Sequence, residues 1–189
     1  KYMPITWMTF FFFFLAQIAT PLFSGFYSKD SIILAVGAST LPAAGFAYYA
    51  VLAGVFVTAF YSFRLYFLVF HGKERYDQNP DQHHHAHHDD DGHGHGHDDH
   101  AKPHESPWVV TLPLVLLAIP SVLIGYFTVN SMLFGDFFKG VIFVDAAKHP
   151  AMADLAQHFH GPVAMALHAF TSVPFWLAVA GVAMSYYMY

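Results

Sequence analysis

The stretch PLFSGFYSKD, residues 21–30, lies inside an apolar run that extends over residues 2–41. A straight helix of about 40 residues would measure about 60 Å, whereas the hydrocarbon core of a bilayer is about 30 Å thick. No loop composition follows the stretch, because apolar residues resume at once. Pro21 removes a backbone donor and Gly25 weakens a helix, so we predict two half-helices around a break at Pro21–Ser28.

The composition of the 189-residue chain is typical of a membrane protein. Hydrophobic residues make up 56% and charged residues 11%, against about 25% charged residues in an ordinary soluble domain. A soluble fold of this size could not cover so much apolar surface, which excludes a soluble enzyme, a disordered chain and a nucleic-acid binder. Cysteine is absent, which excludes disulfides, thiolate metal sites and Fe–S ligands. Because the chain starts at Lys1 and turns apolar immediately, we expect a piece of a longer protein.

The hydrophobic pattern predicts an all-α membrane protein with about four transmembrane helices. The predicted spans cover residues 1–41 (the broken one), 42–70, 108–128 and 163–189. Residues 71–107 form a His- and Asp-rich loop, and residues 129–162 form a link in which apolar and charged residues alternate, as in an interfacial segment. The distribution of Lys and Arg assigns 71–107 to the cytoplasm and 129–162 to the outside.

Lys29 and Asp30 come directly after the predicted break. Inside a bilayer a charged side chain costs about 2.5–3.5 kcal/mol and is normally retained for function. Desolvation disfavours an ammonium ion, so Lys29 could take and release a proton, and Asp30 could stabilise its charged form or serve as the next link. In the alternative interpretation, residues 2–27 form an ordinary span and the pair is an anchor in the membrane interface.

Two other polar side chains lie inside predicted spans. Gln17, one turn before Pro21, could line the same water-filled path or form a hydrogen bond between helices. His168 could join a proton path or form a similar interhelical bond. Prolines inside the last two spans are interpreted as kinks: Pro113, Pro120 and Pro174.

The loop between the second and third spans contains a dense histidine tract. Neutral imidazoles bind Zn, Ni or Cu, so the tract could buffer metal or sense pH through His83, His84, His85, His87 and His88. A metal site needs fixed ligand geometry, which Gly- and Asp-rich sequence does not provide. The composition therefore favours a disordered linker without a metal site.

Three motifs resemble the antiporter-like membrane subunits of respiratory complex I. Residues 21–33 resemble the broken helix of these subunits, residues 58–73 (TAFYSFRLYFLVFHGK) resemble the helix that follows, and PHESP at 103–107 fits the approach to the next span. In that family the Lys at the break carries protons across the outer half of the membrane, which corresponds here to Lys29. Sister subunits and multisubunit antiporters often have Glu at or next to this point, so the Lys29–Asp30 pair favours the L type. By this resemblance the chain would be a C-terminal fragment of such a subunit.

The resemblance implies a multi-pass subunit of the proton-pumping NADH:quinone oxidoreductase in the bacterial inner membrane. Other complex I membrane subunits and the lipid bilayer would be its partners, and nucleic acid would not. The chain itself would hold no cofactor and do no redox chemistry, while FMN, Fe–S clusters and quinone would belong to partner subunits. The alternatives are a subunit of a multisubunit cation/proton antiporter, which has no redox partner, and a structural element of membrane assembly.

Overall fold

The structure of the chain is a computed structural model that describes residues 2–73, 104–143, 145 and 150–189. The regular secondary structure of these residues is helical, as the sequence predicts. Its elements are α1 (Pro4–Gln17), α2 (Ser24–Gly37), α3 (Ala44–Phe70), α4 (Trp108–Val129) with a π-helical turn η4 (Asn130–Phe134), α5 (Ala151–His158), α6 (Pro162–Ala169) and α7 (Val173–Met188). The histidine tract with its predicted linker or metal role lies outside the described residues.

Within residues 2–73, 104–143 and 150–189, two helices are long and apolar enough to cross a membrane. They are α3 and the continuous helix α4–η4, with 27 residues each, which corresponds to about 40 Å. Helices α6 and α7 meet the same criterion together, although they are bent by 57° at the break between them. The chain is therefore a multi-pass membrane protein.

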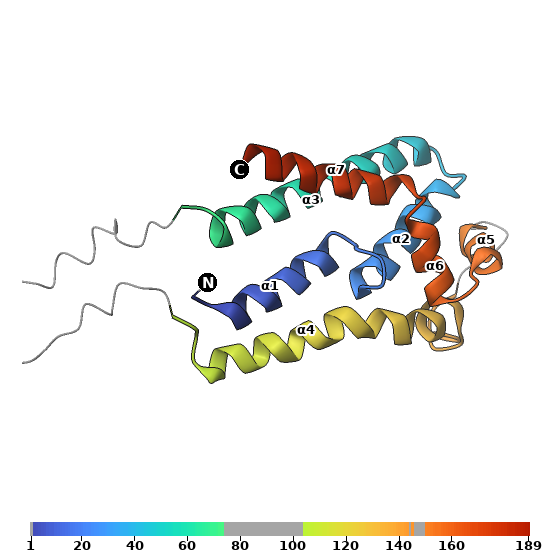
Figure 1. Cartoon of the computed structure of the whole chain (residues 1–189). Helices are drawn as coiled ribbons and strands as arrows, with labels where there is room; N and C mark the ends of the chain where they lie inside the picture. Colours follow the sequence, from blue (N-terminus) through green and yellow to red (C-terminus); the bar gives the residue numbers. More distant parts are fainter. Residues whose placement is uncertain (1, 74–103, 144, 146–149) are drawn as a thin grey trace, which may run out of the picture.

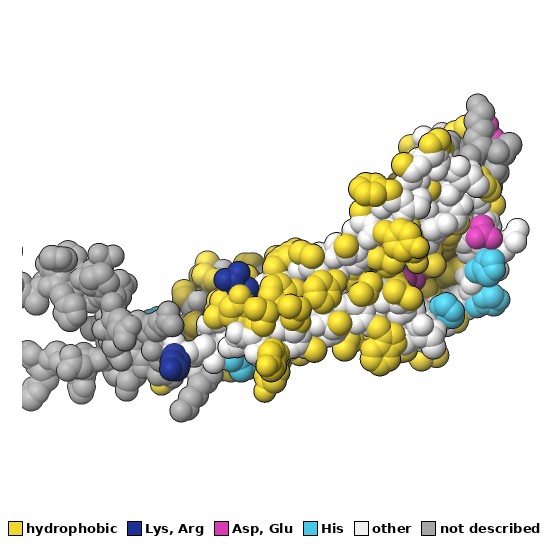
Figure 2. All heavy atoms as spheres, turned by 90° about the horizontal axis from the view of Figure 1, so that it is seen from above, with side chains coloured by type: hydrophobic (Ala, Val, Ile, Leu, Met, Phe, Trp, Pro, Cys, Tyr) yellow, Lys and Arg dark blue, Asp and Glu magenta, His cyan; other side chains and the backbone are white. Residues whose placement is uncertain are grey.

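Helices α1 and α2 together extend over the distance that α3 covers alone (Figure 1). The start of α1, the end of α3, the start of α4 and the end of α7 lie at one end of the molecule, and α5 and α6 lie at the other (Figure 1). Between the two ends, the face in Figure 2 carries mostly hydrophobic side chains. This arrangement agrees with a broken first span, while the side of the membrane that each end faces stays a prediction.

The break in the first span comes earlier than the sequence predicts. It covers residues 18–23, and α2 begins at Ser24, so that Pro21 lies in the break and Gly25 in the first turn of α2. Ala19 and Leu22 adopt left-handed φ angles of 60° and 76°, which non-glycine residues rarely do. Gly25 serves close packing instead of chain breaking, because a Cβ there would lie 2.0 Å from the carbonyl oxygen of Ala16.

The last predicted span, residues 163–189, is also divided in two. The sequence suggests a kink at Pro174, whereas α6 ends at Ala169 and α7 starts at Val173. The hydroxyls of Thr171 and Ser172 donate to the carbonyls of His168 and Ala169 at 2.8 and 2.7 Å, which offers the backbone an alternative to continuing the helix. By contrast, α4 continues through Pro113 and Pro120.

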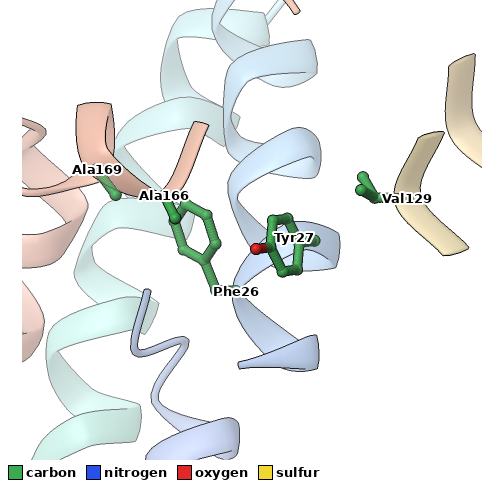
Figure 3. Packing of buried hydrophobic residues seen from close by; sticks show 5 residues of the cluster. All are labelled: Phe26, Tyr27, Val129, Ala166 and Ala169. Carbon is green, nitrogen blue, oxygen red and sulfur yellow. The ribbon is translucent and has the colours of Figure 1, made fainter. Parts of the chain in front are cut away.

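A buried cluster holds α2 between α4 and α6. Phe26 and Tyr27 of α2 are 3% and 2% exposed, and they pack with Val129 of α4 and with Ala166 and Ala169 of α6 (Figure 3). Phe26 lies next to the two alanines, and Tyr27 lies on the side of Val129 (Figure 3). Since the charged pair follows within one turn, this cluster fixes the part of α2 that carries it.

Candidate functional site

The Lys29 ammonium contacts the end of α1. Its Nζ donates a hydrogen bond to the backbone carbonyl of Gln17, the last residue of that helix. The last four carbonyls of a helix have no intrahelical partner, and they form the negative end of the helix dipole. The other three accept bonds from backbone amides in the break, Ile18 to Phe14, Thr20 to Leu15 and Ala19 to Ala16. Lys29 thus satisfies the last carbonyl and adds a positive charge where the dipole favours it.

Asp30 does not neutralise this ammonium. Among the described residues no ion pair joins Lys29 to a carboxylate. Lys29 is half-buried and also lines a groove of about 260 Å³ with Gly54 and Thr58 of α3. The cation is therefore held by a neutral carbonyl.

Lys29 and Asp30 share a small cavity of about 30 Å³. Residues at both helix breaks line it: Pro21 in the first break, Ser172 in the second, and Pro174 in the first turn of α7. Since one water needs about 10–15 Å³ of such volume, the cavity has room for about two waters. The two discontinuities therefore meet at the charged pair.

Asp30 also lines a second cavity of about 500 Å³. His168 of α6 lines the same cavity, which continues to α5 and the residues after it. The structure thus brings Lys29 and Asp30 together at one cavity, and Asp30 and His168 at the next. A carboxyl group common to both can pass a proton from one to the other.

Gln17 contacts Lys29 through its backbone only. Its side-chain Nε2 donates to the hydroxyl of Tyr61 on α3 at 3.3 Å. The structure therefore contains the interhelical hydrogen bond that was one of the two interpretations of Gln17. A role of its side chain in a proton path stays a prediction.

One contact that holds α1 has no clear signal in the sequence. The Glu105 carboxylate accepts a hydrogen bond from Ile5 at the start of α1, and the two residues are 100 positions apart in the sequence. No local sequence pattern predicts such a contact. The second break has a signal that could have been used, since Thr171 and Ser172 precede Pro174 as hydroxyl residues often do at helix starts.

In the part of the chain that the structure describes, no three His, Asp or Glu side chains are placed to hold a metal ion.

Comparison with known proteins identifies relatives over the whole chain. No family model matches. Two proteins of Neisseria meningitidis, from serogroups A and B, are both named NADH-quinone oxidoreductase subunit L, and they are 57% and 56% identical over all 189 residues. The NAD(P)H-quinone oxidoreductase chain 5 of a Picosynechococcus species is 41% identical over 156 residues, or 79% of this chain and 22% of that protein.

The chain spans 28% of the length of the two Neisseria relatives. All three names are those of quinone oxidoreductase subunits, and none favours a multisubunit cation/proton antiporter. The motifs around Lys29 and the all-helical membrane architecture agree with these names. The chain belongs to the family of NADH-quinone oxidoreductase subunit L, of which it represents a C-terminal portion.

Proposed function

We propose that the chain is part of the proton-translocating membrane arm of NADH:quinone oxidoreductase and moves protons as quinone is reduced elsewhere in the complex. The names of its relatives support this function. Its partners are then other complex I membrane subunits and the lipids of a bacterial inner membrane. FMN, Fe–S clusters and quinone belong to partner subunits, which also supply the energy of about 2.3 kcal/mol for each charge moved against 100 mV.

Lys29 is the group that is charged and discharged. The observation that carries this role is the hydrogen bond from its ammonium to the end of α1. A helix terminus stabilises a charge by about 0.3–2 kcal/mol, whereas a carboxylate at 4 Å contributes about 4 kcal/mol at an effective dielectric constant of 20. A cation held by a carbonyl can therefore be discharged by a smaller change in the surrounding charges than a cation in an ion pair.

The proton leaves Lys29 toward Asp30. Water in the small cavity accepts it from the ammonium and passes it to the Asp30 carboxylate, which leaves a neutral amine and a neutral carboxyl group. The carboxyl then releases the proton into the larger cavity, where His168 is the next acceptor. Each transfer runs between groups that line one cavity, as a proton relay requires.

The test uses Lys29→Met and Lys29→Arg in the full-length subunit within the assembled complex. Proton pumping by membrane vesicles is compared with NADH oxidation by an artificial acceptor that takes electrons from the partner subunits. We expect pumping to fall about tenfold or more in both variants, since Met carries no proton and Arg does not release one. NADH oxidation with the acceptor should be unchanged.

The control is Lys139→Met, which removes an exposed lysine paired with Asp136 in the link before α5. It should pump as the wild type does. Wild-type pumping in Lys29→Met would overturn the proposal and favour an assembly role. Pumping lost in Lys29→Met but retained in Lys29→Arg would show that only the charge is needed, and would overturn the discharge of Lys29.

A further inference from the structure

We infer that α5 and the residues after it form the outer mouth of the proton path, where His158 and His160 exchange protons with water outside the membrane. The inference rests on the proposed function of Lys29 and Asp30 and extends it to residues with no assigned role. It starts from the larger cavity, because this cavity connects Asp30 with α5.

Titratable side chains line this cavity from α2, from α6 and from α5 with the residues after it, while η4 contributes only Phe134. Asp30 comes from α2, His168 from α6, and Asp154, His158 and His160 from α5 and the loop behind it. The volume of about 500 Å³ is many times what one water needs. Water can therefore connect the inner carboxyl group to the outer histidines, so that protons need no direct contact between side chains.

The outer residues are open to solvent at the end of the molecule. The His158 and Asp154 side chains are 76% and 56% exposed, and the His158 Nδ1 lies 3.7 Å from the Asp154 carboxylate. Histidine and acidic side chains gather at this end of the surface in Figure 2. A carboxylate beside an imidazole raises the local proton concentration, and imidazole is the side chain that gains and loses a proton most readily near neutral pH.

Backbone contacts fix the tautomer of both imidazole rings. The His158 Nδ1 lies 2.9 Å from the carbonyl oxygen of Asp154, and the His160 Nδ1 lies 2.8 Å from that of His158. A carbonyl only accepts hydrogen bonds, so Nδ1 carries the hydrogen in each ring. In the neutral ring the lone pair is then on Nε2, which accepts a proton and gives it up again without disturbing the Nδ1 contact.

A purely structural role is the competing explanation, because His158 lies in the last turn of α5 and favours the end of that helix when charged. The double variant His158→Asn and His160→Asn separates the two roles. Asn retains an N–H donor for the backbone carbonyls but takes up no proton. Both side chains are exposed, so the variant should fold, and the amount of assembled complex in the membrane verifies this.

The experiment measures the pumping rate of the full complex with weak buffering on the outer side, and again with free imidazole added there. We expect the double variant to pump on the order of tenfold more slowly in weak buffer. This loss is smaller than the rate factor of about 10²–10⁴ that a positioned acid–base group typically contributes. The reason is that Asp154 remains as a proton acceptor. Free imidazole should restore the rate, since it replaces the missing proton acceptor. His104→Asn, at an exposed histidine before α4, should change nothing.

Two results would overturn the inference. In the first, the double variant pumps at the wild-type rate in weak buffer. In the second, its pumping rate falls but free imidazole does not restore it. Lys29→Met is measured in parallel, so that the two proposals fail separately. If Lys29→Met stops pumping while the double variant pumps normally, the mouth is elsewhere and the proposed function stands. If both pump normally, both proposals are wrong.

Discussion

Glu105 and Lys29 bind opposite ends of the same helix. The Glu105 carboxylate accepts hydrogen bonds from the backbone amides of Ile5 and Thr6 at 2.8 and 3.3 Å and from the Thr6 hydroxyl at 2.5 Å. At the other end, the Lys29 ammonium donates to the Gln17 carbonyl. Each charge is opposite in sign to the end of the dipole that it contacts. Helix α1 is thus held by the segment before α4 and by the second turn of α2.

The contact at Glu105 predicts a pH dependence. The hydrogen bond from the Thr6 hydroxyl, with those from the backbone amides, holds the pKa of Glu105 below its usual value. The folded state therefore favours the carboxylate, so the contact contributes its full stability above the pKa of the unfolded chain. This contribution is lost as the pH falls through the lowered pKa of the folded state. The wild-type start of α1 should open in acid.

Glu105→Gln should loosen the start of α1 already at neutral pH, because a neutral amide is a weaker partner for the helix terminus. Hydrogen exchange of a peptide covering Ile5 and Thr6, corrected for the intrinsic pH dependence of exchange, measures this. Asp136→Asn, which removes an exposed ion pair with Lys139, is the control and should leave that peptide unchanged. Wild-type protection in Glu105→Gln at neutral pH would show that the carboxylate does not hold the helix.

Gly25→Ala should separate α2 from α1. The added Cβ would lie 2.0 Å from the Ala16 carbonyl oxygen, and backbone must move to relieve the clash, at a cost of about 1–3 kcal/mol. The same movement would withdraw Lys29 from Gln17, so pumping should fall together with thermal stability. Gly45→Ala, in the first turn of α3, has no atom within 4 Å of its Cβ and should not lower the stability. Equal stability of the two variants would contradict the close contact.

The side-chain bond between Gln17 and Tyr61 can be tested without touching the carbonyl that binds Lys29. Gln17→Ala and Tyr61→Phe each remove the same 3.3 Å hydrogen bond, and each should cost about 1 kcal/mol. The double variant should cost little more than either single one, since the two residues share one interaction. Pumping should stay close to the wild-type rate in both. A loss of pumping in Gln17→Ala alone would instead support a role of the Gln17 side chain in the proton path.

The first break could be predicted because length and Pro21 both require it. Its position could not, since it depends on Ala19 and Leu22 in left-handed conformations that the propensities of both residues disfavour. The second break was predicted only as a kink at Pro174, for a different reason. The apolar pattern of residues 163–189 is continuous, and the hydroxyl bonds of Thr171 and Ser172 that end α6 compete with the helix only locally.

The charged pair of the candidate site could be found in the sequence, because Lys29 and Asp30 are conspicuous in an apolar run. Their partners could not. A backbone carbonyl such as that of Gln17 has no sequence signature, and Glu105 lies 99 residues from Thr6. His158 and His160 are exposed, and only the cavity that they share with Asp30 points to a role for them.

Asp30→Asn tests the connection between the two cavities. Asn has nearly the same size and still accepts hydrogen bonds, but it cannot carry a proton, so the cavities keep their shape while the relay between them is lost. We expect pumping to fall about tenfold, at the same order as for Lys29→Met, with NADH oxidation by an artificial acceptor unchanged. Asp30→Glu restores a titratable carboxyl group and should recover part of the rate. If Asp30→Asn pumps as fast as the wild type, protons reach the larger cavity without this carboxyl group. Water alone must then deliver protons to His168 and to the residues of α5.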